Sequence, residues 1–385
     1  MFFMKEINST NWLQPQNNRK SFQNIRSIFP VISLKKGNDK PSKIVENLRP
    51  IKSIEFEDLD GKKSISDMLK STYTDAFLVL KGDELIFEEY FNEMNSSSLH
   101  LMNSISKSFV GMLAGIFIEN GKIDPNKEIP FYIPEFKGTA FSNTTLQHAL
   151  DMTAAVTFGE DYNDNNADFW HESAVVGWRP DLRKKNSSEN LFDFALSLKD
   201  KDQKDGEKYH YRTVLTNIIV MVIERATDEK FSKLLEKYLW QKLGSEQEAL
   251  IVKDEAGFPY MGAGMNACAR DLARFGLMLL HDGFYNNEQI IPASWIESTK
   301  EGSAHLRKIF SESDYGLMFP EGHYKNQLWI ANPNTMICIG IYGQTIYVNQ
   351  LANIVIVKFS SHPQPADNNL YASVLLGMEA IVNEL

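Results

Sequence analysis

The chain has 385 residues, of which 43% are hydrophobic and 23% are charged, and its formal net charge at pH 7 is −10. This composition is typical of a globular protein with a large core, and the acidic excess argues against nucleic acid or an anionic membrane as a partner. No apolar stretch reaches the roughly 18 residues of a membrane span, and two cysteines indicate no disulfide framework.

The first part of the chain is polar. Residues 1–50 are rich in Asn, Lys and Pro, and we interpret them as an N-terminal arm rather than a domain. Their beginning lacks the basic start, apolar stretch and small-residue cleavage site of a signal peptide, so we expect a cytoplasmic protein.

Strand-like and helix-like segments follow the arm. Residues 74–80 and 84–91 are rich in apolar and aromatic side chains and are separated by Lys81-Gly82-Asp83, which predicts a β-hairpin. Helical periodicity then predicts helices over residues 104–120, 145–152, 188–198, 213–225, 231–242 and 267–280. Towards the end of the chain, strands are predicted over residues 327–331, 336–342, 345–349 and 354–360, and a closing helix over residues 369–384.

This order of elements predicts an α+β fold. Strands at both ends of the chain with helices between them indicate one antiparallel sheet of early and late strands, flanked by helices, instead of the alternating pattern of a parallel sheet. We assign residues 51–103 and 300–385 to an α/β sheet domain and residues 104–299 to an inserted, mainly helical domain. The active site is expected at their junction.

One short motif, Ser104-Ile-Ser-Lys107, stands at the start of the first predicted helix. Positions three apart share a helix face, so the ammonium can lie beside the hydroxyl. A serine hydroxyl needs a neighbouring base to become nucleophilic, and a helix start offers backbone N–H groups to a developing oxyanion. A simple N-cap would also need the hydroxyl, so the motif alone leaves both interpretations open. A second copy, at residues 33–36, has no helical pattern after it and is interpreted as a loop.

Tyr211 stands just before the helix predicted over residues 213–225. A tyrosine can serve as a base where a cation such as Lys107 favours the phenolate. Tyr209 and Tyr211 are also spaced as two residues on one buried side of an extended segment, and His210 between them would then face away. The residue pattern alone favours this structural interpretation.

An acidic, aromatic segment at residues 158–172 is interpreted as a loop, either an ordinary surface loop or a wall over a pocket. Histidines and cysteines show no metal-ligand spacing, and the H-E-x-x-H and G-x-S-x-G motifs do not occur. We therefore expect a site without a metal or other cofactor.

Taken together, these segments resemble the penicillin-recognising serine hydrolases, the group of class C β-lactamases, DD-peptidases and related esterases. Within that group the chain is most similar to the 6-aminohexanoate-dimer hydrolases. The resemblance covers nearly the whole chain and rests on ordered segments at residues 18–23, 103–109, 160–162 with 177–179, 211–213 with 222–227, 269–276, 340–344 and 356–361.

The resemblance implies a β-lactamase/transpeptidase-like fold, with Ser104 as nucleophile, Lys107 as its cationic partner and Tyr211 as general acid/base. It implies oxyanion donors at the backbone N–H groups of Ser104 and Ile341. It also makes Tyr162 a loop tyrosine that closes onto the substrate amide. Further substrate contacts are expected at Trp170, His171, Glu172, Gly340 and Tyr342.

The chain departs from the family pattern at two places. The related lactamases carry Lys-Thr-Gly where this chain has Cys338-Ile339-Gly340, which removes an anchor for the β-lactam carboxylate. The alternative alignment uses Tyr342-Gly343-Gln344. In the Tyr-x-Asn/Ser element, Thr213 keeps a hydroxyl but supplies no amide.

We therefore predict a serine hydrolase that cleaves small amides or esters through an acyl-enzyme, with Tyr211, held anionic or strongly polarised near Lys107, accepting the proton of Ser104. The alternatives are a carboxylesterase of the same fold, a β-lactamase or DD-peptidase, and a catalytically silent binding protein. The expected partner is a small-molecule substrate, with no nucleic acid and no membrane, and a homodimer is left open.

Overall fold

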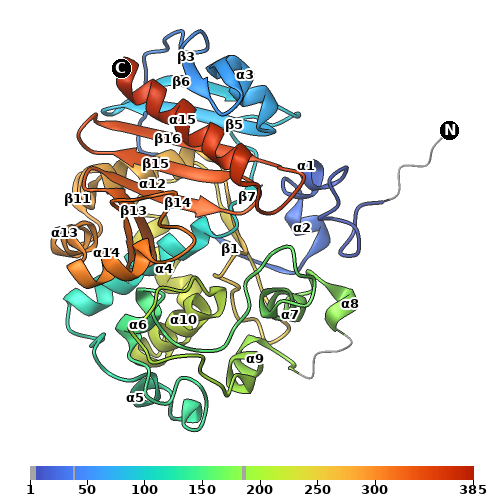
Figure 1. Cartoon of the computed structure of the whole chain (residues 1–385), viewed down its shortest axis with the longest axis vertical. Helices are drawn as coiled ribbons and strands as arrows, with labels where there is room; N and C mark the ends of the chain where they lie inside the picture. Colours follow the sequence, from blue (N-terminus) through green and yellow to red (C-terminus); the bar gives the residue numbers. More distant parts are fainter. Residues whose placement is uncertain (1–5, 38–39, 184–187) are drawn as a thin grey trace.

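The computed structural model describes residues 6–37, 40–183 and 188–385 (Figure 1). Within these residues the largest sheet has eight strands in the order β12-β13-β14-β15-β16-β5-β6-β2, and neighbours are antiparallel except for β2 and β6. The strands are β2 (Val45–Glu46), β5 (Thr74–Lys81), β6 (Glu84–Tyr90), β12 (His323–Lys325), β13 (Leu328–Asn332), β14 (Thr335–Gly340), β15 (Gln344–Asn349) and β16 (Ile354–Ser360).

Early and late strands meet at the centre of this sheet, as predicted. β5 and β6 form the expected hairpin, and β16 pairs along the whole of β5, from Ile354 opposite Lys81 to Ser360 opposite Thr74. β5 and β16 are buried almost throughout, which explains their continuous apolar character. The predicted α+β fold with an antiparallel sheet is confirmed.

Helices cover the sheet. α12 (Ala269–Leu280) packs against β15 and β16, and α15 (Asn368–Glu384) crosses in front of the same strands in Figure 1. α15 also contacts a small hairpin and a short helix, β3 (Glu55–Asp58), β4 (Gly61–Ser64) and α3 (Ile65–Ser71). The predicted division grouped α12 with the helical domain, whereas the structure packs α12 on the sheet.

A helical layer lies below the sheet in Figure 1, and α4 (Ile105–Glu119) runs between the two. α4 contacts β13, β14 and β15 on one side and α10 (Thr213–Thr227) on the other, and most of its residues are buried. The other helices are α5 (Ile129–Tyr132), η1 (Pro134–Phe136), α6 (Leu146–Leu150), α7 (Asp168–Val175), α8 (Pro180–Arg183), α9 (Leu191–Ser197), α11 (Phe231–Leu235), η2 (Glu236–Trp240), α13 (Ala293–Glu301) and α14 (Ala304–Ser311). Among the described residues, none of the helices combines the length and apolarity needed to cross a membrane.

The N-terminal arm is part of the packed body. Trp12 is buried and packs edge-to-face on Trp178, with ring centroids 4.9 Å apart. The arm forms α1 (Asn18–Ser21), α2 (Ile25–Ile28) and β1 (Val31–Leu34), and β1 pairs with β8. The loop predicted at residues 33–36 is therefore wrong at its first two positions, because a strand of four residues is too short to show a period.

β1 belongs to a second, four-stranded sheet in the order β1-β8-β9-β7. Its other strands are β7 (His100–Leu101), β8 (Ala249–Val252) and β9 (Met265–Ala267), and a small hairpin elsewhere is formed by β10 (Phe284–Tyr285) and β11 (Glu288–Gln289). β7 ends just before the Ser104 motif, so this sheet fixes the entry of the chain into α4.

Candidate active site

Ser104 occupies the N-cap position of α4. Its side chain makes no capping hydrogen bond, although an N-cap role was the structural alternative for this residue. The residue before it, Asn103, has a φ of 49°, a left-handed conformation that turns the chain sharply into the helix. The hydroxyl of Ser104 is therefore available for chemistry.

Lys107 lies one turn further along α4 and is 1% exposed. Its Nζ is 2.8 Å from Ser104 Oγ and 2.5 Å from the carbonyl oxygen of Gly262. Burial lowers the pKa of Lys107 to about 8, while the negative charges of Glu160 and Glu172 act in the opposite direction. Near neutral pH a fraction of Lys107 is thus a neutral amine, which can accept a proton from a neighbouring hydroxyl.

Tyr211 completes the group around the nucleophile. Its ring lies 5.0 Å from Lys107 Nζ and stacks on Trp329 with centroids 5.4 Å apart, and the neighbouring Ser104 side chain lowers its pKa. Burial raises the pKa of Tyr211 well above its ordinary value, and Tyr324 and Glu160 add to this effect. Of the two states expected from the sequence, anionic or strongly polarised, burial therefore disfavours the anionic one and favours a phenol that keeps its proton.

Glu160, which is half-buried, and Glu172, which is buried, lie close to Lys107. Glu160 accepts hydrogen bonds from the backbone N–H and hydroxyl of Thr213 and from the Tyr162 hydroxyl, at 2.8 Å for the last. Burial raises the pKa of Glu160, while Lys107 and the bonds from Thr213 lower it. Thr213 thus donates hydrogen bonds to a carboxylate. A hydroxyl can do this, so the amide of the family's Tyr-x-Asn pattern is not needed for this contact.

The end of β14 forms the wall opposite α4. A Cβ on Gly340 would lie 2.4 Å from the Met102 carbonyl oxygen, so only glycine lets the strand approach the turn before Ser104 this closely. Asn103 Nδ2 donates a hydrogen bond to the Ile341 carbonyl oxygen at 3.0 Å. In the part of the chain that the structure describes, neither the Ser104 N–H nor the Ile341 N–H donates to a protein acceptor. Both N–H groups are free to bind an oxyanion.

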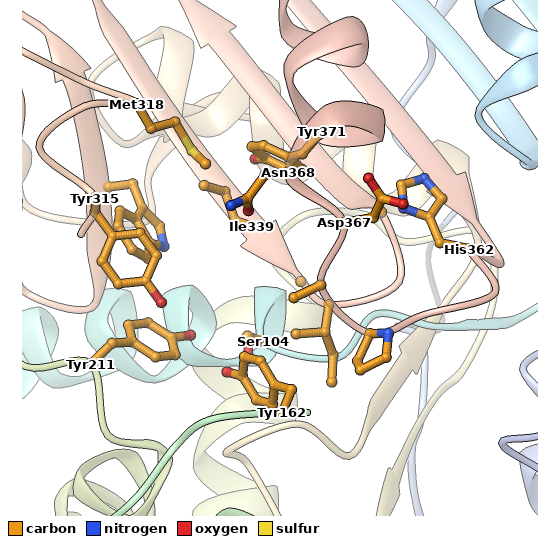
Figure 2. Close-up of a pocket in the computed structure, with 16 residues that line it drawn as sticks. Ser104, Tyr162, Tyr211, Tyr315, Met318, Ile339, His362, Asp367, Asn368 and Tyr371 are labelled. Atoms are coloured by element: carbon orange, nitrogen blue, oxygen red, sulfur yellow. The ribbon is translucent and has the colours of Figure 1, made fainter. Parts of the chain in front are cut away.

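These groups open into a cavity of about 100 Å³ (Figure 2). Figure 2 shows Tyr162 and Tyr211 beside Ser104, with Tyr315 and Met318 facing them. Asp367 is the one residue with a charged side chain among the described residues that line the cavity. The full lining is Ser104, Tyr162, Tyr211, Tyr315, Met318, Trp329, Ile339, Gly340, Ile341, Gly343, His362, Pro365, Ala366, Asp367, Asn368 and Tyr371.

Some predicted pocket residues lie elsewhere. Tyr162 and Gly340 line the cavity, but Trp170 and Tyr342 line a neighbouring cavity that shares only Tyr162 and Pro365 with the first. Glu172 is buried behind Lys107, and His171 lines neither cavity. The reason is that α7 begins at Asp168, which ends the predicted loop early and directs its last residues inward.

Most of the cavity wall was not found from the sequence. The missed residues come from the segment after α14, from β13 and from the turn into α15, and they carry no motif and lie far apart in sequence. One signal for this wall was available in the sequence, the start of the last helix at residues 367–369. There Asp367 caps α15 by accepting hydrogen bonds from the backbone N–H groups of Asn369 and Leu370.

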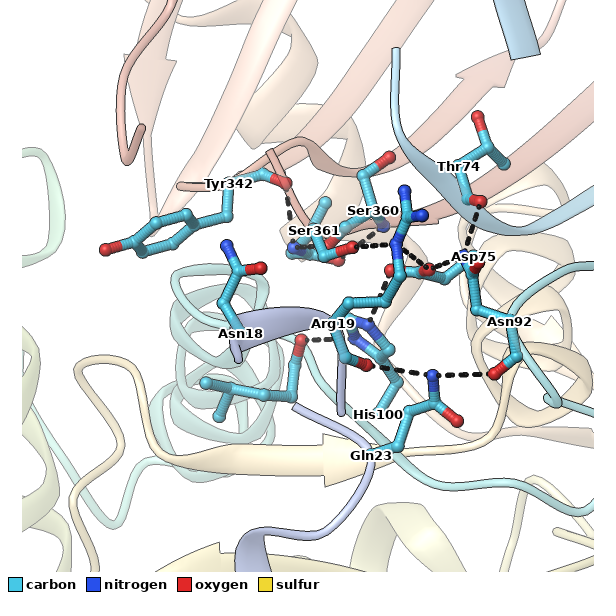
Figure 3. A network of polar contacts seen from close by, with 12 residues as sticks. Asn18, Arg19, Gln23, Thr74, Asp75, Asn92, His100, Tyr342, Ser360 and Ser361 are labelled. Atoms are coloured by element: carbon cyan, nitrogen blue, oxygen red, sulfur yellow. Dashed lines mark hydrogen bonds and ion pairs between the residues drawn. The ribbon is translucent and has the colours of Figure 1, made fainter. Parts of the chain in front are cut away.

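A polar network supports the cavity from the side of the N-terminal arm (Figure 3). Asp75 is fully buried and lies 3.3 Å from His100 Nε2 and 3.6 Å from Arg19 Nε. Asn18 Nδ2 donates to the carbonyl oxygen of His362, a cavity residue, at 2.7 Å. The arm therefore holds the rim of the cavity in place.

A serine beside a buried lysine of lowered pKa, with free backbone N–H groups opposite, defines a serine hydrolase. Residues 63–376 match the model of the Beta-lactamase family, and the chain belongs to this family. It is 30% identical to a 6-aminohexanoate-dimer hydrolase of Paenarthrobacter ureafaciens over 357 residues, which cover 92% of this chain and 88% of the relative.

Solved structures agree with this assignment. A "Putative 6-aminohexanoate-dimer hydrolase from Bacillus anthracis" superposes with a TM-score of 0.88 at 26% identity, covering 100% of this chain and 98% of the other. A family VIII carboxylesterase shares the fold, with a TM-score of 0.58 at 13% identity, over 89% of this chain and 100% of the other.

Proposed function

We propose that this enzyme hydrolyses small amides or esters through an acyl-enzyme on Ser104, with Lys107 as the proton acceptor. The observation that carries the proposal is the 2.8 Å hydrogen bond between Lys107 Nζ and Ser104 Oγ in a buried site. It differs from the expectation drawn from the sequence, which gave the first proton transfer to Tyr211.

In the first half-reaction, Ser104 Oγ attacks the substrate carbonyl carbon and its proton passes to Lys107 Nζ. The resulting oxyanion accepts hydrogen bonds from the Ser104 and Ile341 N–H groups; one such donor typically contributes about 3 kcal/mol. Tyr211 then gives its hydroxyl proton to the leaving nitrogen or oxygen and is reprotonated from Lys107. The carbon–leaving-group bond breaks, and the acyl group stays on Ser104.

In the second half-reaction, water attacks the acyl carbon and its proton passes to Lys107. The bond from the acyl carbon to Ser104 Oγ breaks, and Ser104 recovers a proton from Lys107 directly or through Tyr211. The acid is released and the site returns to its starting state. In both half-reactions Lys107 takes the proton of the attacking hydroxyl group and later gives it back.

The cavity favours particular substrates. Its walls are mainly aromatic and aliphatic, and its lining within the described residues includes Asp367 but no lysine or arginine. Such a wall suits an apolar chain, and it offers no cation to anchor a β-lactam carboxylate. The dimer of 6-aminohexanoate, which the relative's name gives as its substrate, is the first amide to test.

We also place this activity in the cytoplasm. Cys268 and Cys338 are free thiols buried in the protein core. Buried thiols that stay unpaired suit a reducing compartment.

The proposal is tested by trapping the intermediate. The enzyme is mixed with p-nitrophenyl butyrate and quenched in acid during turnover. The masses of the intact protein and of its proteolytic peptides are then measured. We expect a mass gain of one butyryl group on the peptide that contains Ser104, and turnover of the amide dimer in a separate assay. A folded protein that gains no acyl group and turns over neither substrate would support the binding-protein alternative.

The first prediction concerns pH. Because the neutral form of Lys107 accepts the proton, kcat/KM should rise as pH increases through about 8, the pKa of Lys107, and fall about tenfold per unit well below it. The profile is measured with a p-nitrophenyl ester between pH 6 and 9.5, after subtraction of spontaneous hydrolysis. A rate that falls with rising pH in this range would contradict the assignment of Lys107 as the base.

The second prediction concerns Tyr211. Tyr211→Phe removes the proton donor and should lower kcat for the amide dimer by about 10²-fold to 10⁴-fold. The p-nitrophenyl ester should lose much less activity, because p-nitrophenolate leaves without being protonated. The two substrates are compared on one enzyme preparation, and an equal loss on both would show that Tyr211 does not act on the leaving group.

A further inference from the structure

A chain of hydrogen bonds runs behind Lys107, on the side away from the cavity. The Gly262 carbonyl oxygen accepts from Lys107 Nζ at 2.5 Å, and the Gly262 N–H donates to Asn217 Oδ1 at 3.2 Å. Asn217 Nδ2 in turn donates to Glu172 Oε1 at 2.9 Å. Four residues from four separate segments of the chain thus connect a carboxyl group to the amine that receives the Ser104 proton.

The direction of this chain is fixed. The Gly262 N–H is a donor, so the oxygen of the Asn217 amide must face it, and the amide nitrogen must then face Glu172. Gly262 packs closely against α10 and admits no side chain, because a Cβ there would lie 2.4 Å from Thr213 Cγ2. Thr213 and Asn217 are four residues apart on α10, so one face of that helix binds Glu160 and Glu172 through adjacent turns.

The two glutamates are held differently. Glu160 accepts bonds on both carboxylate oxygens, which favours its charged form. Glu172 Oε2 is buried and has no hydrogen-bond partner among the described residues. The pKa of Glu172 is raised to about 8, mainly by burial and also by Glu160 and Asp168, while Asn217 and Lys107 act in the opposite direction. Glu172 is therefore neutralised more easily than an exposed glutamate.

We propose that Glu172 and Asn217 are positioning residues for Lys107: they hold the Gly262 carbonyl against its Nζ, and the charge on Glu172 controls how firmly Lys107 keeps its proton. This inference rests on the proposed function for its catalytic consequence. Neither Glu172 nor Asn217 lines the cavity, so we expect both to act on Lys107 and not on a bound substrate.

The charge effect has a definite sign. Lys107 faces Glu160, Glu172 and the neutral Tyr211, and the Tyr260 phenol lies near Glu172 with its pKa raised well above the ordinary value by burial. Ionised Glu172 stabilises the ammonium form of Lys107, which is the inactive form in the first step. A neutral amide at position 172 removes that stabilisation, so Lys107 loses its proton at lower pH.

The first test is the pH profile of Glu172→Gln. We expect the upper part of its rise in kcat/KM, near and above pH 8 where Glu172 is ionised in the wild type, to move to lower pH by about half a unit, which makes the variant about threefold faster there. Well below pH 8 Glu172 is itself neutral, and the two enzymes should be equally fast. Glu135→Gln, which breaks an exposed ion pair with Arg225, is the matched control and should leave the profile unchanged. An unshifted profile at uniformly lower kcat in Glu172→Gln would overturn the proposal in favour of a packing role.

The second test reverses the hydrogen bond. Asn217→Asp places an acceptor opposite the Glu172 acceptor, and we expect kcat to fall about tenfold or more with KM little changed. In Glu172→Gln/Asn217→Asp the glutamine amide can donate to one oxygen of the new carboxylate, while the other oxygen still accepts from the Gly262 N–H. We expect the double variant to recover part of the lost kcat, and a double variant no better than Asn217→Asp would overturn the relay.

A third readout does not need turnover. In protein labelled with ¹³Cε-lysine, the Lys107 resonance is identified by its loss in Lys107→Arg, and its titration gives the Lys107 pKa directly. We expect a lower pKa in Glu172→Gln than in the wild type, and an equal or higher one would overturn the proposal. If the wild type shows no Ser104-dependent turnover, the proposed function fails, and this titration still decides whether Glu172 acts on Lys107.

Discussion

Ser104→Ala should lower kcat/KM for a p-nitrophenyl ester by about 10⁴-fold or more and leave the protein folded. The Ser104 hydroxyl makes no capping bond, so its loss costs α4 little, whereas the acyl-enzyme cannot form without Oγ. Turnover is measured beside labelling with a fluorophosphonate, which adds a single mass to an activated serine. We expect the adduct in the wild type and none in the variant.

A neighbouring serine provides the control. Ser108 lies one turn beyond Ser104 on α4, is buried, and donates to the Gln327 carbonyl oxygen at 3.1 Å. Ser108→Ala should lose about 1 kcal/mol of stability and keep both the adduct and the turnover. An adduct that persists in Ser104→Ala, or disappears in Ser108→Ala, would place the nucleophile elsewhere.

Lys107→Met should lower kcat by about 10³-fold or more at every pH, because it removes the proton acceptor. It also leaves Glu160 and Glu172 buried without their cation. Breaking a buried charge pair from one side typically costs about 3–5 kcal/mol of unfolding free energy. This loss should be smaller at acidic pH, where the carboxyl groups are protonated, and larger as pH rises and charges them.

Lys107→Arg separates the two roles of the lysine. Arginine keeps the positive charge at every accessible pH and cannot act as a base. We expect Lys107→Arg to be nearly as inactive as Lys107→Met but less sensitive to alkaline pH in chemical denaturation. Substantial activity in Lys107→Arg would show that the site needs the charge alone, and would return the proton transfer to Tyr211.

Local patterns explain what the sequence could predict. β5, β6, α4, α10, α12 and β16 each carry their own period and their own end signals, so they were found close to their observed bounds. The order of the elements also predicted that early and late strands share one sheet, although it did not specify that β16 is the strand that pairs with β5. Ser104 and Lys107 were found because one helical turn places them together.

The remaining features depend on contacts between distant segments. The strands of the second sheet are short, and each is recognisable only beside its neighbour. The sequence predicts a pocket position for Glu172, whereas the structure buries it away from the cavity. The sequence does not show that α7 starts at Asp168 and carries the carboxyl inward. The protonation of Tyr211 depends on how completely Tyr324, Trp329 and their neighbours exclude water, which no single segment specifies.

The pairing of β16 with β5 also governs when the enzyme can begin to work. During synthesis the segment with Ser104 and Lys107 leaves the ribosome long before β14, which carries the second oxyanion donor, and before β16, which closes the sheet. Contacts between such distant segments form late and slowly in folding. A nascent chain therefore holds its nucleophile without the groups that make it reactive, and it acquires hydrolytic activity only after nearly all of the polypeptide has been released.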